Sequence, residues 1–117
     1  RDYLFKDSRK GRVFPVSRPR KGVKEAVLEY RISASAPDGS TSLADITLHT
    51  GRTHQIRVHM KYIGCPLPGD FLYHPVFDRI GRQALHSLQL EFAHPITGEP
   101  MCFLAPVPED FRRAFLQ

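Results

Sequence analysis

Apolar and polar residues alternate along three segments of the chain, residues 26–34, 41–50 and 84–92. A period of two is typical of a strand with one buried face. The turn-forming sequence Pro37-Asp38-Gly39-Ser40 separates the first two segments. A second turn, His94-Pro95-Ile96-Thr97-Gly98, follows the third and leads into a returning strand at 101–105. The pattern therefore predicts two β-hairpins.

Between the predicted hairpins the apolar spacing changes to that of a helix. Ile56, Met60 and Ile63 are spaced by four and three, which predicts a helix from about Thr53 to Ile63 with these side chains on its buried face. Gly64 is the expected stop, because glycine tolerates the left-handed conformation that ends many helices.

A short last helix is expected to open at residues 108–110, where acidic side chains suit the positive end of the helix dipole. Its inner face would bury Phe111, Ala114 and Phe115. The order strand, strand, helix, strand, strand, helix predicts an α+β domain with a mixed, mainly antiparallel sheet and flanking helices.

Charge is concentrated at the start of the chain. Of 117 residues, the first 24 contain nine Lys and Arg against Asp2 and Asp7, a net of +7, whereas the whole chain has +5. We expect residues 1–23 to be a basic lead-in with little regular structure and residues 24–117 to be the folded part. A basic segment attracts polyanions, which favours a nucleic-acid partner, although a solvated tail has the same composition.

Cysteines, histidines and hydropathy exclude other classes of protein. Cys65 and Cys102 are expected to be free thiols in a reducing cytoplasm. No Cys-x-x-Cys pair accompanies His54 and His59, so we expect no metal site. No segment has the roughly 20 apolar residues that span a bilayer, so no membrane association is expected. Because no initiator Met precedes Arg1, we expect the natural start to lie further upstream.

The candidate chemistry lies where the second predicted strand meets the helix, at residues 51–60. A helix N-terminus there offers free backbone N–H groups, which bind anions. Arg57 follows His54 by three residues, so both lie on one side of the helix, and an arginine can hold a carboxylate or phosphate with two hydrogen bonds. The alternative is a surface arginine paired with a nearby acid. His54 and His59 have no serine or cysteine with the context of a catalytic triad.

The run GRTHQIRVHMKYIGCPLPGDFLY resembles a conserved motif of the RluA-type pseudouridine synthases, in which G-R-x-H-Q-I/L-R-x-H leads into G-x-P-x-x-G-D and an aromatic pair. The segments KEAVLEYRI and RQALHSLQLEFAHPITGEPMCFLAPVPEDF also resemble that family. The resemblance covers residues 24–117 and extends only loosely to residues 1–23. It implies the C-terminal part of a pseudouridine synthase catalytic domain.

The resemblance implies that a uridine is flipped out of the RNA and attacked by an aspartate, and that its uracil is released, rotated and rejoined through C5, without metal or cofactor. Arg57 matches the arginine that pairs with this aspartate, and Ile56 matches the residue that lines the uracil pocket. Arg52, His54 and Gln55 match positions expected to contact the RNA backbone and support the pocket.

The chain also departs from the family. The nucleophile motif H-R-L-D and the K-x-Y motif of the stacking tyrosine do not occur in it. The sequence around Asp78 is the most similar to the nucleophile motif, but we do not expect Asp78 to be the nucleophile. We therefore expect an inactive fragment of an enzyme that modifies ribosomal or transfer RNA. The alternatives are a non-catalytic RNA-binding module and a fragment that pairs with a second copy through its exposed sheet edges.

Overall fold

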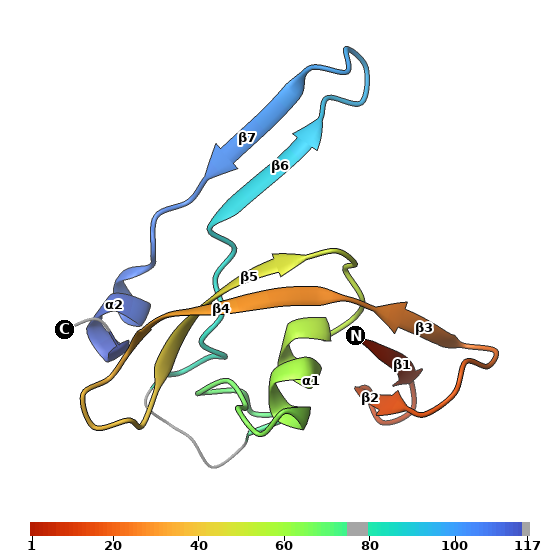
Figure 1. Ribbon diagram of the computed structural model, residues 1–117, viewed down its shortest axis with the longest axis horizontal. Helices are drawn as coiled ribbons and strands as arrows, with labels where there is room; N and C mark the ends of the chain where they lie inside the picture. Colours follow the sequence, from red (N-terminus) through yellow and green to blue (C-terminus); the bar gives the residue numbers. More distant parts are fainter. Residues whose placement is uncertain (75–79, 116–117) are drawn as a thin grey trace.

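The computed structural model describes residues 1–74 and 80–115, so Asp78 lies outside the described residues. Figure 1 shows an α+β fold in which helix α1 lies against the first sheet and a long hairpin extends away from them. The described strands form a three-stranded sheet of order β2-β1-β3 and two hairpins, β4-β5 and β6-β7, and every pairing is antiparallel. The predicted fold class is confirmed.

The first sheet corrects the prediction that residues 1–23 have little regular structure. Strands β1 (Asp2–Asp7) and β2 (Arg12–Val16) and the start of β3 (Val23–Ala26) occupy about half of this segment. The prediction was wrong because charged and turn-forming residues hide a short alternation in which Leu4 and Val13 face inward and are buried. These side chains join one core with residues of the later chain; its buried members are Leu4, Val13, Ala26, Val58 and Tyr73.

The hairpin β4 (Leu28–Ser35) and β5 (Ser42–Leu48) forms as predicted, with a bulge between Ile32 and Ala34. Its apolar face, however, is not buried. Tyr30 and Ile32 are each 50% exposed. The alternation therefore identified the apolar face correctly, but no described element covers the middle of it.

Helix α1 (Gln55–Tyr62) is followed by the predicted stop residue, Gly64, which has φ of +90°. Gly64 N donates to Lys61 O and Cys65 N donates to Met60 O, the paired hydrogen bonds of a glycine-terminated helix. The predicted buried face was wrong in part: Met60 is buried, but Ile63 is 51% exposed and Ile56 only half-buried. The buried side instead carries Gln55, Val58, His59 and Met60.

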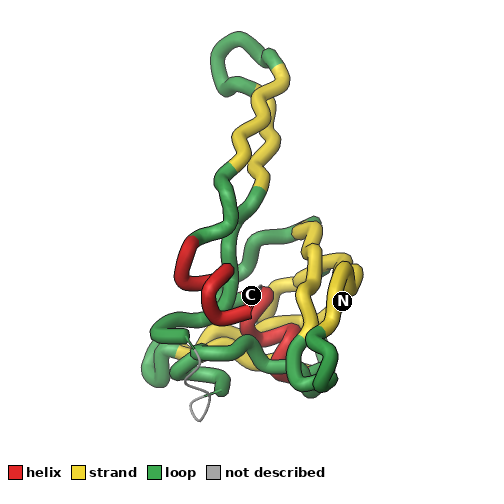
Figure 2. The backbone as a smooth tube through the Cα atoms, turned by 90° about the vertical axis from the view of Figure 1, so that its left-hand side faces the viewer, coloured by secondary structure: helices red, strands yellow, loops and turns green. Residues whose placement is uncertain are grey.

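The C-terminal hairpin β6 (Gln89–Ala93) and β7 (Pro100–Leu104) stands apart from the rest of the molecule (Figure 2). Helix α2 (Glu109–Phe115) follows it and is bound to the loop before β6 by two hydrogen bonds of 2.9 Å from Arg82 to the Asp110 carboxylate. The expected inner face of this helix is half-buried rather than buried. Within residues 1–74 and 80–115 no helix is long and apolar enough to span a bilayer.

Candidate functional site

The start of α1 is held by the side chain of Gln55, which is only 3% exposed. Its Oε1 accepts hydrogen bonds from Arg52 N at 2.9 Å and from Thr50 Oγ1 at 2.8 Å, and its Nε2 donates to Val27 O at 3.1 Å. His54 precedes the helix in the left-handed conformation, with φ of 54°. Gln55 therefore ties the start of α1 to Val27 and Thr50, next to strands β4 and β5. Its Oε1 also occupies the Arg52 N–H, one of the backbone amides that we expected to bind an anion.

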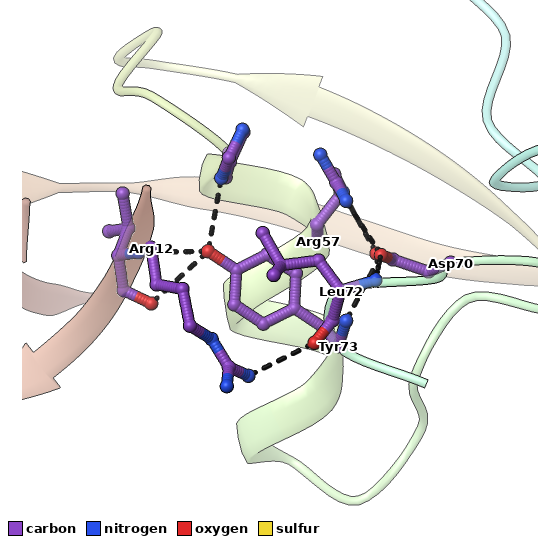
Figure 3. Close-up of polar contacts among 7 residues, drawn as sticks. Arg12, Arg57, Asp70, Leu72 and Tyr73 are labelled. Carbon is purple, nitrogen blue, oxygen red and sulfur yellow. Dashed lines mark hydrogen bonds and ion pairs between the residues drawn. The ribbon is translucent and has the colours of Figure 1, made fainter. Parts of the chain in front are cut away.

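Arg57 forms a buried ion pair with Asp70 (Figure 3). Arg57 Nε donates to Asp70 Oδ2 at 2.9 Å and Nη2 donates to Oδ1 at 2.7 Å. The carboxylate is fully buried and also accepts from the backbone N–H groups of Leu72 and Tyr73, each at 3.1 Å. Such a two-pronged contact holds the plane of the guanidinium in one orientation.

Tyr73 packs beneath this pair and joins it to the first sheet. Its hydroxyl accepts a hydrogen bond from Val13 N at 2.9 Å and lies 3.0 Å from His54 Nδ1. The Cζ atoms of Arg57 and Arg12 lie 5.2 and 5.4 Å from the centre of its ring, within the range of cation–π attraction. One buried aromatic residue therefore contacts α1, β2 and the loop that carries Asp70.

Burial and charge shift the ionisation of these groups. Burial acts to raise the pKa of Asp70, but the hydrogen bonds from Arg57, Tyr73 N and Leu72 N outweigh it and hold that pKa below its usual value. The hydrogen bond to Asp70 raises the pKa of Arg57. Burial and the nearby Arg57 cation lower the pKa of His54, which favours its neutral form. The pair is therefore charged and the neighbouring imidazole tends to be neutral.

A pocket of about 210 Å³ opens beside the first turn of α1. It brings together all the residues selected from the sequence, and its full lining is Leu48, Gly51, Arg52, His54, Gln55, Ile56, Arg57 and Leu85. Arg57 is 16% exposed and so reaches the pocket with part of its side chain. His59 is separate: it is buried on the opposite side of the helix, with Nε2 3.3 Å from Asp2 Oδ2.

Sequence reasoning placed the acid partner of Arg57 outside the chain, whereas the structure provides one within it. Asp70 follows Arg57 by 13 residues, a separation without helical or strand periodicity, so no spacing rule could pair them. The sequence feature that could have pointed to Asp70 is the pair Gly69-Asp70 at the end of a proline-rich loop. Gly69 has φ of +75°, and a Cβ atom there would lie 2.1 Å from Arg82 O, so the loop needs glycine at this position.

Comparisons with known proteins bear on this arrangement. The family model described as RNA pseudouridylate synthase matches residues 2–62, more than half of the chain. The chain belongs to the RNA pseudouridine synthase family. The chain is similar to the uncharacterized RNA pseudouridine synthase YjbO of Bacillus subtilis, with 52% identity over 77% of this chain. It is also similar to the ribosomal large subunit pseudouridine synthase D of Haemophilus influenzae, with 45% identity over 75% of this chain.

This pseudouridine synthase chain spans about a third of the length of the relatives that it matches, 31% in both of these cases. The match to the family model begins at residue 2 and so includes the first sheet, to which the resemblance of the sequence had extended only loosely. The identification as an RluA-type synthase is confirmed, and the residues that the family model matches include α1 and the pocket residues from Leu48 to Arg57.

Proposed function

We propose that this chain is the C-terminal part of the catalytic domain of an enzyme that isomerises uridine to pseudouridine in ribosomal or transfer RNA. The observation that supports this proposal is the orientation of Arg57 by the buried Asp70 carboxylate beside a pocket that Ile56 also lines. The nucleophilic aspartate would come from a segment that these residues do not include, and the chain alone would then be inactive.

Arg57 can serve a second carboxylate without releasing Asp70. The two bonds to Asp70 use Nε and Nη2, so Nη1 remains as a donor. A nucleophilic carboxylate next to this guanidinium would be kept ionised and directed at the sugar of the flipped uridine. Ile56 would contact the uracil, while Arg52 and His54 would contact the RNA backbone and Gln55 would support the pocket. Asp70 would act as the positioning residue that holds Arg57 in place.

The test is pseudouridine formation by the full-length protein with Arg57 intact, changed to Ala and changed to Lys. We expect Arg57→Ala to lower turnover by about 10²-fold or more, the typical loss when one preorganised charged donor is removed, with RNA affinity largely retained. Arg57→Lys should rescue little, because lysine keeps the charge but cannot form the two-pronged contact.

Arg112→Ala is the matched control, because Arg112 is exposed on α2, away from the pocket. It should leave turnover unchanged. Wild-type turnover in the Arg57→Ala protein would contradict the proposal that Arg57 belongs to the active site. An absence of pseudouridine formation by the unaltered full-length protein, with RNA binding retained, would favour a non-catalytic RNA-binding module instead.

The relatives named for the large ribosomal subunit make ribosomal RNA the first substrate to test, with transfer RNA as the comparison. Both are consistent with a cytoplasmic protein, as are the two exposed free thiols, Cys65 and Cys102, which suit a reducing compartment. Modification of transfer RNA alone would exclude the ribosomal substrate.

We also propose that the chain by itself associates into a homodimer through its sheets. The hairpin β6-β7 exposes apolar side chains on one face, where Leu90 is 57% and Phe103 53% exposed and the two face each other across the strands. An isolated two-stranded hairpin is marginally stable in water, which favours its pairing with another surface. Light scattering after size exclusion tests this, and a monomer at high concentration would contradict it.

A further inference from the structure

Two connections of the first sheet carry exposed cationic side chains. The turn between β1 and β2, residues 8–11, and the connection between β2 and β3, residues 17–22, together form what we call the basic loops. Their Lys and Arg side chains are Arg9, Lys10, Arg18, Arg20 and Lys21, and all of these residues are exposed. Within the described part of the chain, none of them forms an ion pair with a carboxylate.

The β1–β2 turn is fixed by the only acid close to it in sequence. Asp7 Oδ1 accepts hydrogen bonds from Arg9 N at 3.0 Å and from Lys10 N at 3.2 Å. These bonds use the backbone of Arg9 and Lys10, and both residues are exposed. The turn therefore presents two cations from an ordered backbone.

The β2–β3 connection must cross the sheet, because β2 and β3 lie on opposite edges of β1. It is held on the outer face by Phe5, whose ring lies 4.8 Å from the Cζ atom of Arg20. Val23 N donates to Arg20 O at 3.0 Å, and Gly22 has φ of +83° next to the same ring. The connection is thus anchored at Arg20, while Arg18 and Lys21 on either side of the anchor are exposed.

We propose that the basic loops bind the sugar–phosphate backbone of RNA at a surface separate from the α1 pocket. This inference rests on the proposed function, which makes RNA the partner. An ordered set of cations without acid partners suits a polyanion, because each phosphate contact releases counterions and needs no base-specific geometry. The loops belong to the first sheet, at the right-hand side of Figure 1, and none of their residues lines the pocket.

The test is the salt dependence of RNA binding by this chain and by the quadruple variant Arg9→Gln, Lys10→Gln, Arg18→Gln, Lys21→Gln. Arg20 is retained because it packs on Phe5. Affinity for a fluorescent stem-loop RNA is measured from 50 to 300 mM salt. Each lost phosphate contact lowers the slope of log affinity against log salt by about 0.7–0.9. We therefore expect the variant to lose about three units of slope if all four residues contact phosphates.

The matched control is Arg112→Gln with Arg113→Gln, which removes charge from exposed side chains of α2. It should leave the slope within about half a unit of wild type. Amide spectra of each protein establish that the fold is retained. An unchanged slope in a folded quadruple variant, or an equal loss in the control, would overturn the proposal, as would an absence of RNA binding by the wild-type chain.

The two proposals fail in different assays. Loss of pseudouridine formation on changing Arg57 tests the isomerase in the full-length protein, whereas the salt slope of this chain tests the basic loops. If the full-length protein forms pseudouridine but the salt dependence of RNA binding is unchanged in the quadruple variant, only the proposal for the basic loops is refuted. If the salt dependence is steep and depends on the basic loops but no pseudouridine forms, that proposal stands and the proposed isomerase activity is refuted.

Discussion

Asp70→Asn is the sharpest perturbation of the site, because it removes one charge and almost no volume. The Asp70 carboxylate is fully buried and accepts two hydrogen bonds from Arg57 as well as backbone N–H groups of the same loop. An asparagine in the same position has one acceptor oxygen. Its NH₂ group would face an Arg57 nitrogen that is itself a donor, so one hydrogen bond becomes a repulsive contact.

The expected loss of unfolding free energy is about 3–5 kcal/mol, the typical effect of removing one partner from a buried ion pair. Arg57 is 16% exposed, so water can partly solvate the remaining cation, and we expect the lower end of that range. Urea denaturation of the 117-residue chain, followed by circular dichroism at pH 7, measures the difference. Asp45→Asn is the control, because the Arg31–Asp45 pair is exposed and contributes less than about 1 kcal/mol.

The pH dependence provides a second check with a definite sign. The pKa of Asp70 lies below its usual value in the folded protein, whereas an unfolded aspartate titrates near 3.9. The stabilisation by its charge is therefore complete above about pH 5 and is lost as the pH falls through the folded pKa. The difference between wild type and Asp70→Asn should be largest near pH 7 and narrow below about pH 4. A loss no greater than that of Asp45→Asn, or a difference independent of pH, would refute the reasoning.

Three further changes, two in the supports of the site and one at the separate His59, are measured by the same denaturation assay. Gly69→Ala should cost about 2 kcal/mol or more, since a Cβ would meet Arg82 O at 2.1 Å, whereas Gly39→Ala, with similar φ and open space, should show only the backbone strain of about 1–2 kcal/mol. Tyr73→Phe keeps the ring but leaves a buried backbone N–H of β2 unpaired, which costs about 1–3 kcal/mol. Burial lowers the pKa of His59, so stability should fall as the pH drops below about 6.5, and His59→Gln should reduce that fall; an equal fall in both proteins would contradict it.

Local pattern was sufficient for much of the fold. The period of two located β4 and β6. The turn after each of these strands predicted its hairpin partner, β5 or β7, and Gly64 marked the end of α1. These features depend on neighbours a few residues away, which is why sequence alone predicts them. The candidate residues around Arg57 also belong to one continuous run of the sequence. Because α1 and the turn before it bring this run to one pocket, the sequence could predict which residues line it.

The sequence by itself therefore determined the α+β class, the two hairpins, the family and the run of residues that lines the pocket. Only the tertiary structure decided that the basic start of the chain is a sheet, that Asp70 orients Arg57, and that Tyr73 joins α1 to β2. The reason is physical: Asp70 lies 13 residues from Arg57 and Tyr73 lies 60 residues from Val13, and all three features depend on burial that no local period encodes. Alternation likewise identifies an apolar face, but only the packing of the folded chain decides whether anything covers it.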